Sequence, residues 1–134
     1  MKKTFVLLLL SAILFRCKKE NDFNSLRSAI AGTWELRNYS CGECTTPNVD
    51  YSAGNGNLII IYANGNFERR QHDTLVFKGS YVIDKSIDCP EDIIFTTNET
   101  SYPEASAVSV NGAILYLSTS SCLADGASRQ YQRL

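Results

Sequence analysis

The feature of this sequence that most limits its fold is a repeated alternation of apolar and polar residues in short segments. Such alternation places every second side chain on one face of a sheet. Regularly spaced short strands are typical of an antiparallel sandwich or an up-and-down barrel. The chain is therefore expected to be all-β. Eight strands are predicted, at residues 34–39, 58–62, 67–72, 75–83, 93–96, 105–110, 113–117 and 129–133.

Glycines mark the expected turns and bends between and within these strands. Asn64-Gly65 and Asn111-Gly112 each lie between two predicted strands. Asn-Gly is a strong hairpin signal because a type I′ turn needs positive φ at both central residues. Gly79 lies within a predicted strand, which indicates close backbone approach or a bend. The strand at 67–72 is polar, so it is expected to be exposed.

The first sixteen residues have the pattern of an export signal. Lys2 and Lys3 are followed by an apolar run from Phe5 to Phe15, which is too short for a membrane-spanning helix of about 20 residues. A basic start and a short apolar run are typical of a signal peptide. A buried core helix is the alternative, but this run has no polar face. We therefore expect residues 1–16 to be a signal peptide.

The residues after this run resemble the lipobox of bacterial lipoproteins. Leu14 stands three residues before Cys17, and the charged run 18–22 follows it, as in lipoproteins of the Bacteroidetes type. Arg16 departs from the family pattern, in which a small residue precedes the cysteine. The resemblance implies that Cys17 carries acyl chains such as palmitate and that residues 17–22 form a tether. It also implies attachment to the bacterial outer membrane, at its periplasmic or cell-surface face.

Removing the expected signal peptide changes the charge of the chain. The full sequence has 13 basic and 14 acidic residues, and residues 1–16 carry three of the basic ones. The ten basic and fourteen acidic residues that remain offer no attraction to nucleic acid or to anionic lipid. No nucleic-acid partner is therefore expected, and membrane attachment must come from the acyl chains.

A short helix is predicted between the tether and the first strand. A cap residue at Asp22 or Asn24 begins it, and Gly32 lies just beyond its end. Its apolar residues recur at helical spacing, at Phe23, Leu26 and Ile30.

A second resemblance lies at the two ends of the predicted sheet. Gly32-Thr33-Trp34 resembles the Gly-x-Trp motif of the lipocalins, and Arg133 matches that family's C-terminal arginine. The turn at 122–126 is similar to the final hairpin of small lipocalin-like lipoproteins of the Bacteroidetes. This resemblance covers residues 23–134. It implies an eight-stranded antiparallel up-and-down barrel with a short N-terminal helix, in which Arg133 packs over Trp34 and closes the barrel.

Four cysteines remain beyond Cys17. They are Cys41, Cys44, Cys89 and Cys122, an even number in an exported chain, so two disulfides are expected. A zinc site and a redox pair are the alternatives, but only the first two cysteines have ligand spacing and no βαβ pattern surrounds them. In a barrel, the end of the first strand and the loop before the last share a rim. Cys41 or Cys44 should therefore pair with Cys122, and the other bridge is left open.

Two classes of function fit a barrel of this size. The first is a module that binds a small apolar ligand inside the barrel. Its candidate lining residues are Leu36, Phe77, Tyr81, Phe95, Tyr116 and Tyr131. Eight strands enclose an interior that side chains just fill or that holds one small ligand. The second is a structural or protein-interaction module with a filled barrel, in which the long loop at 40–57 carries recognition.

Catalysis is the least supported function. His72 is the single histidine, and no motif places a serine and an acidic residue beside it. We therefore expect no enzyme, no cofactor, no metal site and a monomeric protein whose partners are the membrane and a small hydrophobic ligand.

Overall fold

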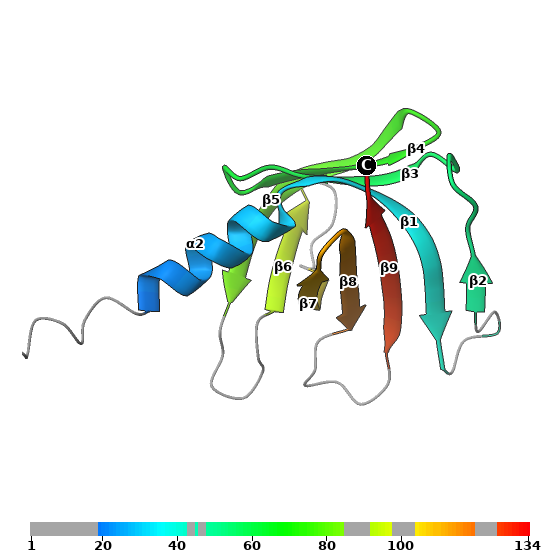
Figure 1. Cartoon of the computed structure of the whole chain (residues 1–134). Coiled ribbons are helices and arrows are strands. Elements are labelled where there is room, and N and C mark those ends of the chain that lie inside the picture. Colours follow the sequence, from blue (N-terminus) through cyan, green and yellow to red (C-terminus); the bar gives the residue numbers. More distant parts are fainter. Residues whose placement is uncertain (1–18, 43–44, 46–47, 85–91, 98–103, 120–125) are drawn as a thin grey trace, which may run out of the picture.

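A computed structural model describes residues 19–42, 45, 48–84, 92–97, 104–119 and 126–134. Within these ranges the helix α2 (Lys19–Ile30) is followed by strands that curve around a common interior (Figure 1). The strands are β1 (Gly32–Cys41), β2 (Asn48–Asp50), β3 (Asn57–Ile61), β4 (Asn66–Gln71), β5 (Thr74–Asp84), β6 (Asp92–Thr97), β7 (Glu104–Asn111), β8 (Ile114–Thr119) and β9 (Ala127–Arg133).

Eight of these strands form a closed antiparallel up-and-down barrel. Strand β1 pairs with β3, each strand from β3 to β8 pairs with the next in chain order, and β9 returns to pair with β1 from Trp34 to Cys41. The eight predicted strands and the preceding helix are therefore confirmed. The helix begins earlier than predicted, at Lys19, because Lys19 and Glu20 are favourable helix residues.

The short strand β2 is an addition to the predicted set. It lies in the long loop after β1 and pairs with β1 at residues 38–40, where β3 no longer reaches. A segment of three residues is too short for apolar and polar residues to alternate recognisably, so the sequence did not predict this strand.

The hairpin between β3 and β4 differs from the predicted type I′ turn. The Gly65 amide donates to the Tyr62 carbonyl over 3.1 Å, and the Tyr62 amide donates to the Asn66 carbonyl over 2.9 Å. Only Gly65 in this turn has positive φ, at 90°. This pattern is a type I turn followed by a glycine bulge. The two-residue turn with positive φ at both positions is instead His72-Asp73, between β4 and β5.

Close packing between β5 and β6 confirms the expectation for Gly79. A Cβ placed on Gly79 would overlap the Thr96 carbonyl oxygen and lie 3.1 Å from the Phe67 ring. The space beside this glycine is filled by Phe67, whose ring meets that of Phe95 edge to face at a centroid distance of 4.7 Å. The strand β4 is therefore not simply exposed, since Phe67 belongs to the buried core.

One end of the barrel is sealed by the last turn of α2 together with Trp34 and Arg133. The Trp34 indole donates to the Ile30 carbonyl over 2.7 Å. The Arg133 guanidinium lies 4.1 Å from the centre of the Trp34 ring. It also donates to the carbonyls of Ala31 and Ala29 over 2.9 and 2.5 Å. The final carbonyls of a helix have no partner within it, so these two side chains supply what the helix end lacks.

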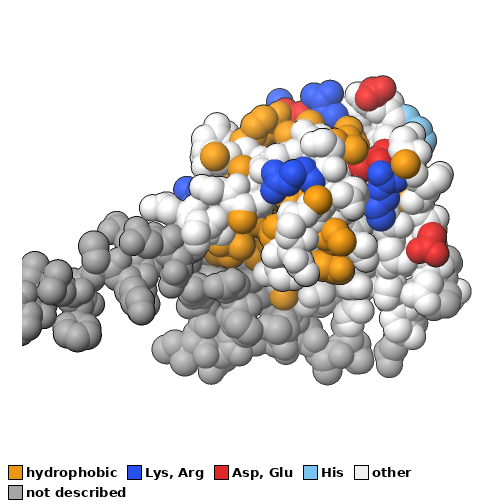
Figure 2. Space-filling view, viewed as in Figure 1, with side chains coloured by type: hydrophobic (Ala, Val, Ile, Leu, Met, Phe, Trp, Pro, Cys, Tyr) orange, Lys and Arg blue, Asp and Glu red, His pale blue; other side chains and the backbone are white. Residues whose placement is uncertain are grey.

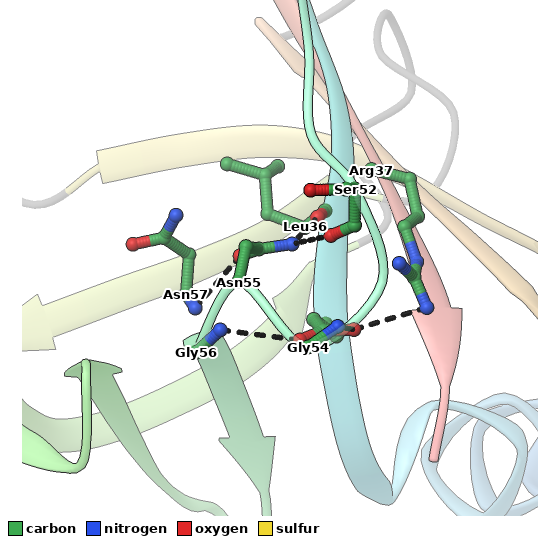
Figure 3. Close-up of polar contacts among 8 residues, drawn as sticks. Leu36, Arg37, Ser52, Gly54, Asn55, Gly56 and Asn57 are labelled. Atoms are coloured by element: carbon green, nitrogen blue, oxygen red, sulfur yellow. Dashed lines mark hydrogen bonds and ion pairs between the residues drawn. The ribbon is translucent and has the colours of Figure 1, made fainter.

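The loop that follows β2 is tied to the outer side of β1 by the buried carboxylate of Glu35 (Figure 3). The amides of Gly54 and Gly56 donate to its two oxygens over 3.1 and 3.2 Å. Arg37 lies 3.0 Å from the same carboxylate. Asn55 adds a donation to the Leu36 carbonyl over 2.8 Å. This loop is therefore held in one conformation by backbone and side-chain bonds.

Basic, acidic and apolar side chains are interspersed on the face of the barrel seen in Figure 2. Within the described residues, no helix combines the length and the apolar composition needed to cross a membrane.

Candidate ligand-binding site in the barrel

The interior of the barrel divides into a filled half and an open half. Next to α2 the inward-facing side chains pack into a continuous core, which includes Trp34, Ile59, Ile61, Phe67, Tyr81, Leu115 and Leu117. The opposite half extends to the pair of Asn57 and Gln71 at the far ends of β3 and β4. The polar and half-buried inward-facing residues gather in this second half.

Five of the six predicted lining residues face the interior. Tyr81, Phe95 and Tyr131 are buried in the core. Leu36 and Phe77 are half-buried and border a recess in the open half. The recess therefore begins where the buried aromatic side chains end.

The prediction for Tyr116 is wrong. Its side chain is 39% exposed, whereas its neighbours Leu115 and Leu117 are buried. Because side chains alternate along a strand, the two leucines occupy the inward positions of β8 and Tyr116 lies on the outer face. An aromatic ring does not by itself predict an inward orientation, because a tyrosine at the surface keeps its hydroxyl hydrated.

A charged cluster in the open half was not predicted. Arg69 lies two residues after the buried Phe67 on β4, and Arg129 lies two residues before the buried Tyr131 on β9. Residues two apart on a strand share a face, so both arginines are on the inward face. Both guanidinium groups bind the carboxylate of Glu104, over 2.8 Å from Arg69 and 2.9 Å from Arg129. We call these three residues the arginine cluster. The sequence contained a signal for this cluster, because each arginine is two residues from an aromatic residue of the core. Our prediction of the inward face considered only apolar residues and therefore missed the two arginines.

The electrostatics of the arginine cluster keep its acid ionised. Burial by itself would raise the pKa of Glu104, but hydrogen bonds and positive charge from Arg69 and Arg129 lower it overall. Burial raises the pKa of the neighbouring Tyr131. At neutral pH the arginine cluster therefore consists of two cations and one carboxylate, with the neutral phenol of Tyr131 beside it.

The recess has a volume of about 290 Å³. Its apolar wall includes Leu36, Phe77 and Tyr131, and its polar wall includes Arg69 and Arg129. A smaller pocket of about 80 Å³ adjoins Arg69 and Phe77 and is bordered by the Phe95 ring. Arg69 and Phe77 therefore border both spaces. Leu58, Arg70 and the exposed Val76 also border the larger one, which places the recess at the rim of the barrel.

A larger groove of about 510 Å³ lies on the outer face of β4 and β5. Its acidic residue Glu68 already binds Arg70 through Nε and Nη2, over 3.1 and 2.8 Å. The groove lies outside the barrel and its acidic residue is already paired, so it is a weaker candidate than the recess.

Several predicted residues lie outside the described ranges. These are Cys17, Cys44, Cys89, Cys122 and the signal peptide at 1–16. Cys41 is buried at the end of β1, opposite Ala127 at the start of β9. His72 is exposed in the β4–β5 turn. Among the residues described, no three His, Cys, Asp or Glu side chains come together as a metal site would require.

Comparison of the chain with family models, curated proteins and solved structures finds no match.

Proposed function

We propose that this chain is a lipocalin-like lipoprotein, anchored to the bacterial outer membrane through Cys17, whose barrel binds a small ligand with an apolar body. The observation that carries the binding function is the recess between Leu36, Phe77 and Tyr131, in a barrel whose other half is filled. Small-molecule sites are concave, mostly apolar and furnished with a few polar groups. The recess has this character.

The size of the recess limits the ligand. Pockets for small molecules run from about 300 to 1,000 Å³, and the recess of about 290 Å³ lies at the lower end of that range. The core residues beside α2 leave no continuation of this space toward Trp34. The ligand is therefore small and enters from the end of the barrel remote from the helix.

Binding should be visible as thermal stabilisation. We expect at least one member of a panel of linear alcohols and carboxylates with four to twelve carbons to raise the melting temperature. A ligand at about ten times its Kd adds about 1.4 kcal/mol to the free energy of unfolding, or several degrees. Phe77→Ala should reduce this rise, because it removes a wall of the recess.

Tyr116→Ala is the matched control, since it removes an aromatic ring from the outer face of the same barrel. A panel in which no member stabilises the protein would contradict the binding function. It would favour the alternative, a structural or protein-interaction module with the loop at 40–57 as its contact surface.

The anchor is tested by replacing the proposed lipid-bearing cysteine. Cys17→Ser should move the protein from the membrane fraction to the soluble fraction of its bacterial host, because acyl chains supply the membrane affinity. Arg16→Gly, which restores a small residue before the cysteine, should remain in the membrane fraction. Retention of Cys17→Ser in the membrane would rule out this anchor.

The proposal includes two disulfides among the remaining cysteines. Cys41 lies opposite the first residue of β9, and Cys122 shortly precedes that strand in the sequence. This placement supports a bridge from Cys41 or Cys44 to Cys122. The intact mass of the extracted protein reports both the acyl chains on Cys17 and the loss of two hydrogens for each bridge.

A further inference from the structure

The strongest unexplained feature of the barrel is one edge of the Arg69 guanidinium. Its Nη1 donates to Glu104 over 2.8 Å. Within the described residues, its Nε and Nη2 are the two buried side-chain polar atoms that lack a hydrogen-bond partner. Buried donors without partners are costly, and folded proteins rarely keep them without a reason. The unpaired edge is therefore a candidate binding group.

The geometry of this edge fits one kind of acceptor. Nε and Nη2 lie side by side in the guanidinium plane and donate in nearly parallel directions, which matches the two oxygens of a carboxylate. The neighbouring Arg70 shows the same edge in use, since its Nε and Nη2 both bind Glu68. Arg69 offers this edge inside the barrel, while Arg70 uses it on the outside.

The charge of the cluster fits a ligand that carries a single negative charge. Glu104 is shared between Arg69 and Arg129, so two cations face one carboxylate. One positive charge is left without an opposite charge within the cluster. A carboxylate bound at Arg69 would balance that charge, whereas a dianion such as a phosphate monoester would exceed it.

The surroundings of Arg69 add an apolar requirement. Its guanidinium lies 5.4 Å from the centre of the Phe95 ring. Phe77 borders both spaces that Arg69 borders, and Leu36 continues the apolar wall of the larger one. An acceptor at Arg69 would therefore have an apolar body lying against Phe77 and Leu36.

We propose that the ligand of the barrel is a small monocarboxylic acid with an apolar body, held by Nε and Nη2 of Arg69 and packed against Phe77. This inference rests on the proposed binding function and names its ligand class. Glu104, held also by Arg129, binds the opposite side of the Arg69 guanidinium through Nη1, and Arg69 borders both spaces. Its free edge is buried, so the carboxylate would reach it as the side chains around it move aside.

The test compares acids with alcohols of the same chain length. Binding of butanoate, octanoate and dodecanoate to the full-length protein is measured by calorimetry, beside 1-butanol, 1-octanol and 1-dodecanol. At least one acid should bind about tenfold or more tightly than its alcohol, because only the acid accepts two charge-assisted hydrogen bonds. Arg69→Met should abolish this preference, measured within the variant as the ratio of the affinities for the acid and for its alcohol.

Two further variants make the test specific. Arg69→Lys keeps the charge and lacks the planar edge, so it should retain only part of the preference. Lys78→Met removes an exposed cation from β5 that borders neither space, so this variant should retain all of it. Should Arg69→Met fail to fold, the comparison of Arg69→Lys with Lys78→Met still decides the matter.

The possible outcomes distinguish failure of the carboxylate inference from failure of the proposed binding function. Equal binding of acids and alcohols, or a preference for acids that survives in Arg69→Met and Arg69→Lys, would overturn the carboxylate inference while the binding function stands. Tighter binding of octyl phosphate than of octanoate would also overturn it. If no probe binds, the proposed binding function fails together with it.

Discussion

Replacing Arg133 with methionine should lower the free energy of unfolding by about 3 kcal/mol. The substitution removes hydrogen bonds to the carbonyls of Ala31 and Ala29 and the stacking on Trp34. Hydrogen bonds to charged groups contribute about 1.5–3 kcal/mol, and a cation over an indole about 0.5–2 kcal/mol, although such terms do not simply add. Urea unfolding followed by the fluorescence of the single tryptophan measures the loss directly at the site.

Two companion variants show whether the effect comes from the barrel closure. Arg133→Lys keeps the charge near the helix end and loses the planar stacking, so its cost should be intermediate. Arg70→Met removes an arginine whose ion pair with Glu68 is on the outer face, and should cost less than about 1 kcal/mol. A loss in Arg133→Met no larger than in Arg70→Met would refute the closing role.

Replacing Glu35 with alanine should cost a similar amount, about 3 kcal/mol. The change leaves the amides of Gly54 and Gly56 without their acceptor and Arg37 without its partner. Breaking a buried ion pair by removing one member typically costs about 3–5 kcal/mol, and Arg37 is partly exposed, which reduces the penalty. Chemical denaturation gives the total, and hydrogen exchange of the two glycine amides gives the local effect.

Glu68→Ala is the matched control, because it removes the same side chain from an ion pair on the outer face. Its cost should stay below about 1 kcal/mol. Unchanged protection of Gly54 and Gly56 in Glu35→Ala would contradict the anchoring role of this carboxylate.

The same carboxylate predicts how stability depends on pH. Burial alone would raise the pKa of Glu35, but the glycine amides and the charge of Arg37 outweigh it and lower the pKa. Its stabilisation is therefore complete above the pKa that a glutamate has in the unfolded chain. It is lost as the pH falls below that value and through the lowered pKa of the folded state. The stability difference between the natural protein and Glu35→Gln should shrink over that acidic range.

Alternation and turn residues were enough to predict the strands and the closed barrel. They located the strand that carries Trp34, because apolar Trp34 and Leu36 flank polar Glu35 there. The last strand, ASRQYQR, has no such alternation, and the resemblance to the lipocalins drew attention to Arg133 in it. They did not reveal β2, whose pairing depends on where β3 ends rather than on its own residues.

The proposed binding site was harder to predict than the barrel. The apolar pattern drew attention to aromatic residues, and Tyr116 shows that an aromatic ring does not define the inward face. Arg69 and Arg129 share the inward face with Phe67 and Tyr131, but charged residues in a predicted strand are normally assigned to solvent. Only the three-dimensional structure shows that Glu104, from a distant strand, brings the two arginines together inside the barrel.

The loop held by Glu35 affects the free energy with which the proposed ligand would bind. Tyr51 and Asn57, at the two ends of that loop, border the recess, and Gly56 is bonded to the β4–β5 turn through the His72 amide over 2.9 Å. The loop that borders the recess is thus preorganised in the protein without a ligand. A ligand need not order this segment on entry, so little of its binding energy is spent on conformational entropy. Even a small ligand, with few contacts to offer, can then be retained.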